Sequence, residues 1–245
     1  MEHRQAPAGR DASVRRMAER SVLVTGGAGG LGGAAVAAFV EAGWRVIVPE
    51  REARPGSEPA AGVLRLVADL SDPAGATRAV EAAAGDPAAP LRAVVNLVGG
   101  YASEGLVHET PIEVFERMLT VNLRPTYLVT QAALPHLVAA GGGAVVCVSA
   151  RAAVAPFAGA AGYVTAKAGV LAFANAVAVE YRPRNVRCNT VLPSVIDTPA
   201  NRAAQPDADH SRWVAPDEIA LVIRFLASEE SAPTSGATVP VYGRA

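Results

Sequence analysis

A glycine-rich turn constrains this chain more than any other feature. Glycines spaced as G-x-x-x-G-x-G at 26–32 follow a short apolar run at 21–24 and precede an alanine-rich run at 33–41. A strand that turns sharply into a helix leaves the first helical N–H groups unpaired at the positive end of the helix dipole. Glycine lets a phosphate approach that backbone closely, and the absence of Lys-Ser or Lys-Thr after Gly32 argues against a Walker loop. The turn therefore predicts a diphosphate site formed by Thr25, Gly26, Gly30, Leu31 and Gly32.

Length, net charge and cysteine content favour one compact domain. The 245 residues suit one domain at 21–245 behind a flexible N-terminal tail at 1–20, and the formal net charge of -1 gives no electrostatic case for nucleic acid or an anionic membrane. Cys147 and Cys188 each lie in an apolar run, which predicts buried, reduced thiols. No apolar run reaches transmembrane length, and the start lacks the apolar centre of a signal peptide. We expect a cytoplasmic protein with a small-molecule partner.

Strand-like and helix-like segments alternate along the rest of the chain. We predict strands at 21–24, 45–48, 63–68, 91–98, 144–149, 186–192 and 238–241, and helices at 33–41, 73–84, 111–139, 162–179 and 216–227. Thr110 is the expected N-cap of the third helix, which Pro125 and Pro135 should kink or divide. Residues 51–62 show no helical period and predict a loop. The alternation predicts a Rossmann-like α/β fold, with a doubly wound parallel sheet of about seven strands and helices on both faces.

Charged residues at the strand ends are candidates for contacts with the adenosine half of a dinucleotide. Glu50 stands beside Arg51 at the end of the second strand. An acid there accepts hydrogen bonds from ribose hydroxyls, whereas a base pairs with a 2'-phosphate. Because the glycine turn carries no Lys or Arg, we predict NAD(H) in preference to NADP(H), although both residues could simply be solvated loop charges. Asp69, just past the third strand, is placed to accept a hydrogen bond from an adenine amino group.

Polar residues further along the chain are candidates for the reacting half of the site. Asn96 ends a strand before Gly99 and Gly100, whose small size lets a cofactor ribose pass. Tyr163 and Lys167 lie at i and i+4 on one helix face, whereas Asn122, within an apolar helix, is compatible with a satisfied core amide. Asp207, Asp209 and His210 have a spacing that suggests a metal, but without a second cluster we favour solvated loop residues and predict no metal site.

Taken together and in order, these motifs resemble the short-chain dehydrogenase/reductase family from about residue 22 to residue 243. The resemblance rests on the glycine turn, Asp69, Asn-Leu-Val-Gly at 96–99 in place of the family's N-N-A-G, Asn122, Tyr-Val-Thr-Ala-Lys at 163–167 and Val-Leu-Pro-Ser-Val-Ile-Asp-Thr at 191–198. It implies further cofactor contacts from Leu70, Asn96, Val98, Gly99 and Lys167, and from Pro193, Val195 and Thr198 beside the nicotinamide carboxamide.

The resemblance also implies an NAD(P)-dependent oxidoreductase acting on a small carbonyl or alcohol. Tyr163 would be the acid and base, Lys167 would lower the pKa of that phenol, and Asn122 would hold a water in the proton path. Assembly would be as a homodimer or homotetramer through the two long helices.

One position departs from the family pattern. The serine usually found thirteen residues before the tyrosine is Ala150 here, and Ser149 precedes it. Either a one-residue bulge brings Ser149 into the site as a fourth catalytic residue, or that residue is absent. The run at 149–153 resembles that of dihydropteridine reductases in the same family. Two alternatives therefore stay open: a dihydropteridine reductase-like enzyme, and a non-catalytic dinucleotide-binding protein.

Overall fold

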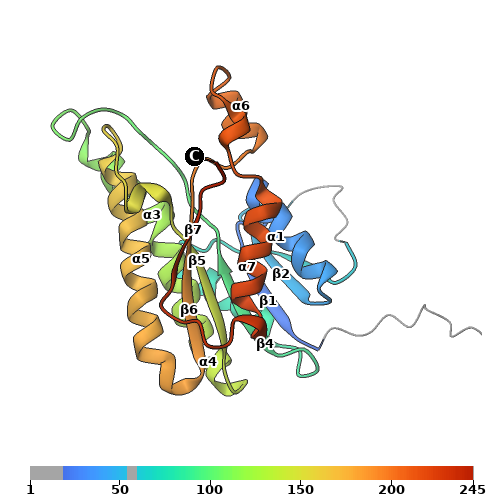
Figure 1. The fold of residues 1–245 in the computed structure, drawn as a ribbon. Coiled ribbons are helices and arrows are strands. Elements are labelled where there is room, and N and C mark those ends of the chain that lie inside the picture. Colours follow the sequence, from blue (N-terminus) through green and yellow to red (C-terminus); the bar gives the residue numbers. More distant parts are fainter. Residues whose placement is uncertain (1–18, 54–59, 245) are drawn as a thin grey trace, which may run out of the picture.

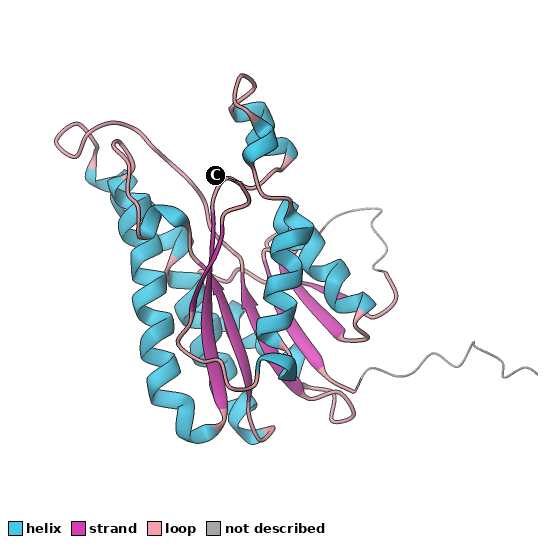
Figure 2. Ribbon diagram, in the orientation of Figure 1, coloured by secondary structure: helices cyan, strands magenta, loops and turns pink. Residues whose placement is uncertain are grey.

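The computed structural model describes residues 19–53 and 60–244, so nearly all of the predicted tail at 1–20 and the middle of the predicted loop at 51–62 lie outside the described residues. Within these residues, seven strands are interspersed with helices (Figure 2). The strands are β1 (Ser21–Thr25), β2 (Arg45–Glu50), β3 (Val63–Val67), β4 (Leu91–Asn96), β5 (Gly143–Val148), β6 (Val186–Pro193) and β7 (Thr238–Val241). The main helices are α1 (Gly30–Glu41), α2 (Pro73–Ala84), α3 (Ile112–Asn122), α4 (Arg124–Ala139), α5 (Ala161–Tyr181), α6 (Pro199–Ala204) and α7 (Pro216–Ala227).

The strands form one parallel sheet in the order β3-β2-β1-β4-β5-β6-β7, which confirms the predicted doubly wound architecture. The strand order reverses between β1 and β4, so connections leave these two neighbours in opposite directions. In such sheets ligands bind outside the carboxyl ends of the strands at that reversal. The glycine turn after β1 lies there.

Helices cover both faces of the sheet (Figure 1). One buried cluster joins α2, α4 and α5 to side chains such as Leu23, Ile47 and Val145, and the other joins α1 and α7 to Val24, Val46 and Val146. Successive strand residues point to opposite faces, so apolar runs such as residues 22–24 contribute side chains to both clusters.

Details of three helices differ from the prediction. The predicted helix at 111–139 is two helices that meet at Leu123, two residues before Pro125, because proline cannot donate an N–H inside a helix. Pro111, not Thr110, is the N-cap of α3, and the Thr110 hydroxyl donates to the carbonyls of Gly105 and Leu106 instead. The short α6 follows Thr198, whose side chain accepts the N–H of Asn201.

Helix α5 also corrects the expectation about apolar length. Residues 161–184 are long and apolar enough to cross a membrane by length and composition alone. The helix nevertheless contains Lys167 and buries Val170, Ala174 and Val177 in the core cluster shared with the sheet. Its apolarity therefore has a packing explanation.

Candidate active site

The turn between β1 and α1 has the geometry of an anion cradle. Gly26 has a φ of +67°, and the N–H of Gly29 donates to its carbonyl at 3.0 Å. A Cβ on Gly32 would lie 2.0 Å from the oxygen of Gly26, and one on Gly30 would lie 2.7 Å from a methyl carbon of Thr198. No described side chain caps the start of α1, so its first N–H groups remain available to a ligand, while Leu31 lies half-buried beneath them.

Thr25 braces this turn against the neighbouring strand. Its hydroxyl oxygen accepts the N–H of Leu97 at 3.0 Å and that of Val98 at 3.3 Å, and its own proton goes to the carbonyl of Val95. A Cβ on Gly26 would lie 3.1 Å from the nitrogen of Val98. Thr25 thus positions the ends of β1 and β4 from a buried location.

Among the described residues at the adenosine end, Arg65 is a charged residue that the sequence pattern did not single out. Glu50 is paired with Arg65 of the neighbouring strand, which occupies an ordinary position inside the predicted strand. Asp69 is exposed and accepts the N–H and the hydroxyl of Ser71, which lower the pKa of its carboxyl; the nearby charge of Arg51 lowers it further. Leu70, beside Asp69, is buried.

Asn96 lies deeper than a direct cofactor contact requires. Its Nδ2 donates to the hydroxyl of Thr130 at 3.0 Å and contacts the Sγ of Cys147 at 3.8 Å, and the whole side chain is buried. Its Oδ1 is buried without a hydrogen-bond partner in the described part of the chain. Cys147 and Cys188 are both buried and reduced, as the sequence predicts. Asn96 therefore holds the floor of the site.

Gly99 and Gly100 connect the glycine turn to the centre of the site. A Cβ on Gly99 would lie 2.6 Å from Oδ1 of Asn122 and 3.1 Å from Nζ of Lys167. Asn122 is fully buried at the end of α3, where its Oδ1 accepts the N–H of Gly100 and its Nδ2 donates to the carbonyls of Gly100 and Met118. Its side chain thus anchors this loop, in keeping with the bracing amide expected from its surroundings.

Tyr163 and Lys167 lie one turn apart on α5, and their pKa values shift through burial. Desolvation lowers the pKa of the Lys167 ammonium to about 8, and Nζ donates to the carbonyl of Val148 at 3.2 Å. Burial, with a smaller effect from Tyr101, raises the pKa of Tyr163 to about 12. The expected lowering by Lys167 is not seen in this arrangement, in which burial is the main cause of the shift.

Ser149 lies behind the site. Its Oγ donates to the backbone carbonyl of Lys167 at 2.6 Å and is buried. The pairing of β5 with β6 is regular up to Val148 and continues in the N–H of Ser149, which donates to Val191. The bulge that would have turned the hydroxyl into the site is absent from this stretch, so the Ser149 hydroxyl is bonded to the backbone of Lys167 and does not replace the serine missing at Ala150.

The segment after β6 folds over the glycine turn. Pro193 ends β6, the carbonyl of Val195 accepts the N–H of Val214 at 3.1 Å, and Thr198 packs its methyl group against Gly30. Ser194, in place of the family's usual glycine, donates to the carbonyl of Tyr242 at 2.7 Å. This brings Thr198 to the start of α1.

Tyr101 is a neighbour of Tyr163 that sequence reasoning missed. Its ring packs edge-on against that of Tyr163, with centroids 5.1 Å apart, and its other side faces Phe157 at 6.5 Å. The side chain is 62% exposed. An aromatic residue directly after Gly99-Gly100 at a strand end was the available signal.

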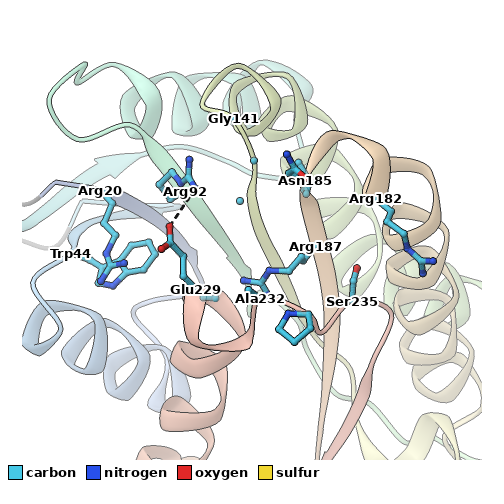
Figure 3. A pocket seen from close by; sticks show the side chains of 15 residues that line it. Arg20, Trp44, Arg92, Gly141, Arg182, Asn185, Arg187, Glu229, Ala232 and Ser235 are labelled. Atoms are coloured by element: carbon cyan, nitrogen blue, oxygen red, sulfur yellow. Dashed lines mark ion pairs between the residues drawn. The ribbon is translucent and has the colours of Figure 1, made fainter.

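A cavity of about 680 Å³ lies elsewhere, beside the amino ends of the strands (Figure 3). Three of the four arginines in its lining are engaged: Arg187 donates to the carbonyls of Leu226 and Ser228, Arg92 donates to Ala140 and pairs with Glu229, and Arg20 stacks over Trp44. The described residues hold no group of three or more His, Cys, Asp or Glu that could bind a metal. The candidate active site is therefore the carboxyl edge.

Comparison with known proteins identifies the family of the chain. Residues 20–209 match the family described as short chain dehydrogenase. The chain is 32% identical to 2-(R)-hydroxypropyl-CoM dehydrogenase of Xanthobacter autotrophicus, over 91% of this chain and 97% of that enzyme. It is 31% identical to 2,5-dichloro-2,5-cyclohexadiene-1,4-diol dehydrogenase of Sphingobium indicum, over 94% and 97%. A short-chain type dehydrogenase/reductase from Mycobacterium ulcerans superposes with a TM-score of 0.84 at 26% identity, over 92% and 89% of the two chains.

Proposed function

The chain belongs to the short-chain dehydrogenase family, and we propose that Tyr163 is the acid and base of its reaction. It is an NAD(P)-dependent oxidoreductase acting on CH–OH or C=O groups of a small molecule. The observation that carries the proposal is a short path of contacts: Gly26 lies against Val98, and the next residue, Gly99, lies against Nζ of Lys167, one helical turn from Tyr163.

The described residues fit a dinucleotide. The uncapped start of α1 and the bare backbone at Gly30 and Gly32 suit a diphosphate, because a Cβ at either glycine would fill the space. Asp69 and Leu70 suit the adenine end, Val98, Gly99 and Lys167 suit the ribose next to the nicotinamide, and Pro193, Val195 and Thr198 suit the carboxamide. When bound, the nicotinamide supplies or accepts the hydride.

Tyr163 donates the proton in the reduction and accepts it in the oxidation. With a pKa of about 12 the phenol is protonated at neutral pH and donates a proton to a carbonyl oxygen that becomes an alcohol. In the reverse direction the phenolate must form, and a protonated Lys167 beside it favours that charge. Ser149 supplies no second donor, because its hydroxyl is bonded to the backbone of Lys167. Tyr163 therefore binds the substrate oxygen without a second hydrogen bond from the serine that the family usually has.

We propose NAD(H) as the preferred cofactor. Glu50 ends β2, which is the strand position where an acid accepts hydrogen bonds from the adenosine ribose. A 2'-phosphate at this place would meet that carboxylate, and charge repulsion would weaken its binding.

The proposal extends to assembly and location. Exposed apolar side chains on α4 and α5, including Tyr127 and Val179, support a homodimer or homotetramer through these two helices. We propose a cytoplasmic enzyme with a residue 1–20 tail attached to a single domain at 21–245.

The test replaces Tyr163 with Phe, which keeps the ring and removes only the hydroxyl. Turnover of a panel of ketones with NADH, and of secondary alcohols with NAD, should fall about a thousandfold. NADH affinity, followed by nicotinamide fluorescence, should stay within about twofold, because no cofactor group is assigned to this hydroxyl. Tyr181→Phe, near the other end of α5, is the matched control and should retain activity. Turnover that survives in Tyr163→Phe would remove the assigned role.

A further inference from the structure

An ion pair lies at the carboxyl ends of β2 and β3. The register sets Arg65 opposite Val48, and Glu50 is two residues beyond Val48, so both charged side chains point to the same face of the sheet. A guanidinium nitrogen of Arg65 donates to Oε1 of Glu50. The Glu50 side chain is only 7% exposed, whereas that of Arg65 is 29% exposed.

This pairing changes what a ligand meets at the adenosine end. The carboxylate of Glu50 is compensated by a guanidinium that remains more accessible than the carboxylate itself. A second guanidinium, that of Arg51, is exposed close enough to lower the pKa of Asp69. An arginine has five N–H donors, so Arg65 can bond a carboxylate and still offer donors to a phosphate.

We propose that Arg65 is a specificity-determining residue of the cofactor site, and that it reduces the difference between the affinities for NADH and NADPH. The inference rests on the proposed function, since it assumes that the adenosine ribose lies beside Glu50. Without Arg65 the site would carry one positive charge less against a 2'-phosphate of about two negative charges. With Arg65 the repulsion is offset, so NADPH becomes an acceptable second cofactor.

The test titrates purified protein with NADH and with NADPH and follows nicotinamide fluorescence. Arg65→Met keeps an unbranched apolar stem and removes the charge. We expect it to weaken NADPH binding about tenfold, as loss of a charge-assisted contact does, and to leave NADH binding within about threefold. Arg65→Lys retains the charge, so its ratio of the two affinities should stay near that of the wild type.

Two further variants complete the design. Glu50→Gln removes the repelling charge and leaves Arg65 to the phosphate, so the preference should turn toward NADPH; this variant also tests the inference if Arg65→Met folds poorly. Arg184→Met, an exposed arginine beyond α5, removes the same charge far from β3 and should leave the ratio unchanged.

The outcomes separate the two levels of inference. Binding of both dinucleotides with a ratio that Arg65→Met leaves within about twofold of the wild type would overturn the role of Arg65 and leave the proposed function standing. Wild-type protein that binds neither NADH nor NADPH would overturn the proposed function, and this inference with it.

Discussion

The two edges of the sheet use polar groups in opposite ways. At the amino edge, arginines donate to the carbonyls that end the helices: Arg45 to Ala82 and Ala83 of α2, Arg92 to Ala140 after α4, and Arg187 to Leu226 and Ser228 at the end of α7. Each positive charge also lies at the negative end of a helix dipole. These groups satisfy one another within the protein.

At the carboxyl edge, backbone groups at the start of α1 have no side-chain partner among the described residues. The start of α1 has no side-chain cap, and the glycines around it keep its backbone bare. Tyr163 and Lys167 lie one helical turn apart on α5; burial raises the pKa of Tyr163 and lowers that of Lys167. Cavity volume does not identify the site, because two cavities of about 680 Å³ are present: one lies at the satisfied edge, and the other is lined by Asp197, Arg202 and His210 after β6. Unmet hydrogen-bonding capacity identifies it better.

The largest effect on NADH affinity should come from adding a side chain to the glycine turn at the carboxyl edge. Gly32→Ala places a Cβ 2.0 Å from the oxygen of Gly26, so the turn must shift. We expect NADH affinity to fall about a hundredfold, equivalent to roughly 3 kcal/mol of overpacking strain at the diphosphate position. Gly33→Ala is the matched control, since nothing lies within 4 Å of its added Cβ. Equal affinities of the two variants in a fluorescence titration would contradict the cradle geometry.

Removing a hydrogen-bonded arginine at the amino edge should lower the free energy of unfolding and leave NADH affinity unchanged. Arg187→Met strips the donor from the carbonyls of Leu226, Ser228 and Ser231. We expect the free energy of unfolding in urea to fall by about 2–3 kcal/mol, the cost of leaving buried acceptors unpaired. NADH affinity of the folded protein should not change. Arg184→Met, which is exposed, should cost less than about 0.5 kcal/mol. A loss of NADH affinity in Arg187→Met would show that the edges are coupled.

A smaller effect should appear in the pH dependence of stability. The pKa of Lys167 is about 8 in the folded protein against an ordinary value of 10.5, so between these values the unfolded chain binds more protons. Stability therefore rises with pH in this window. From pH 8 to pH 9.5 we expect the Lys167 contribution to raise the free energy of unfolding by about 1.5 kcal/mol.

The measurement compares urea unfolding of wild type and Lys167→Met across that window, and the variant should lack this rise. Lys167 is the only lysine of the chain, so protein labelled with ¹⁵N-lysine reports its ammonium group as a single side-chain NMR signal. Titration of that signal near pH 10.5 would contradict the burial argument.

Much of the architecture follows from local patterns. Apolar runs and helical periods predict all seven strands and most helices to within a few residues, because these features depend on neighbours close in the chain. The glycine spacing at 26–32 and the i, i+4 pair of Tyr163 and Lys167 are local in the same sense. Even the break before Pro125 follows from the chemistry of one residue.

Contacts between distant segments could not be predicted in this way. The register of β2 against β3 sets Glu50 beside Arg65, which lie fifteen residues apart, and regular pairing of β5 turns Ser149 toward the backbone of Lys167. The loop after β4 lays Tyr101 on Tyr163. A sequence pattern specifies which face of an element is apolar, whereas the partner of each polar side chain and the burial that shifts a pKa depend on how elements pack. The fold was therefore accessible from the chain alone. The ion pair at Glu50, the position of Ser149 and the shifted pKa values of Tyr163 and Lys167 depend instead on how the packed elements set their neighbours and exclude water.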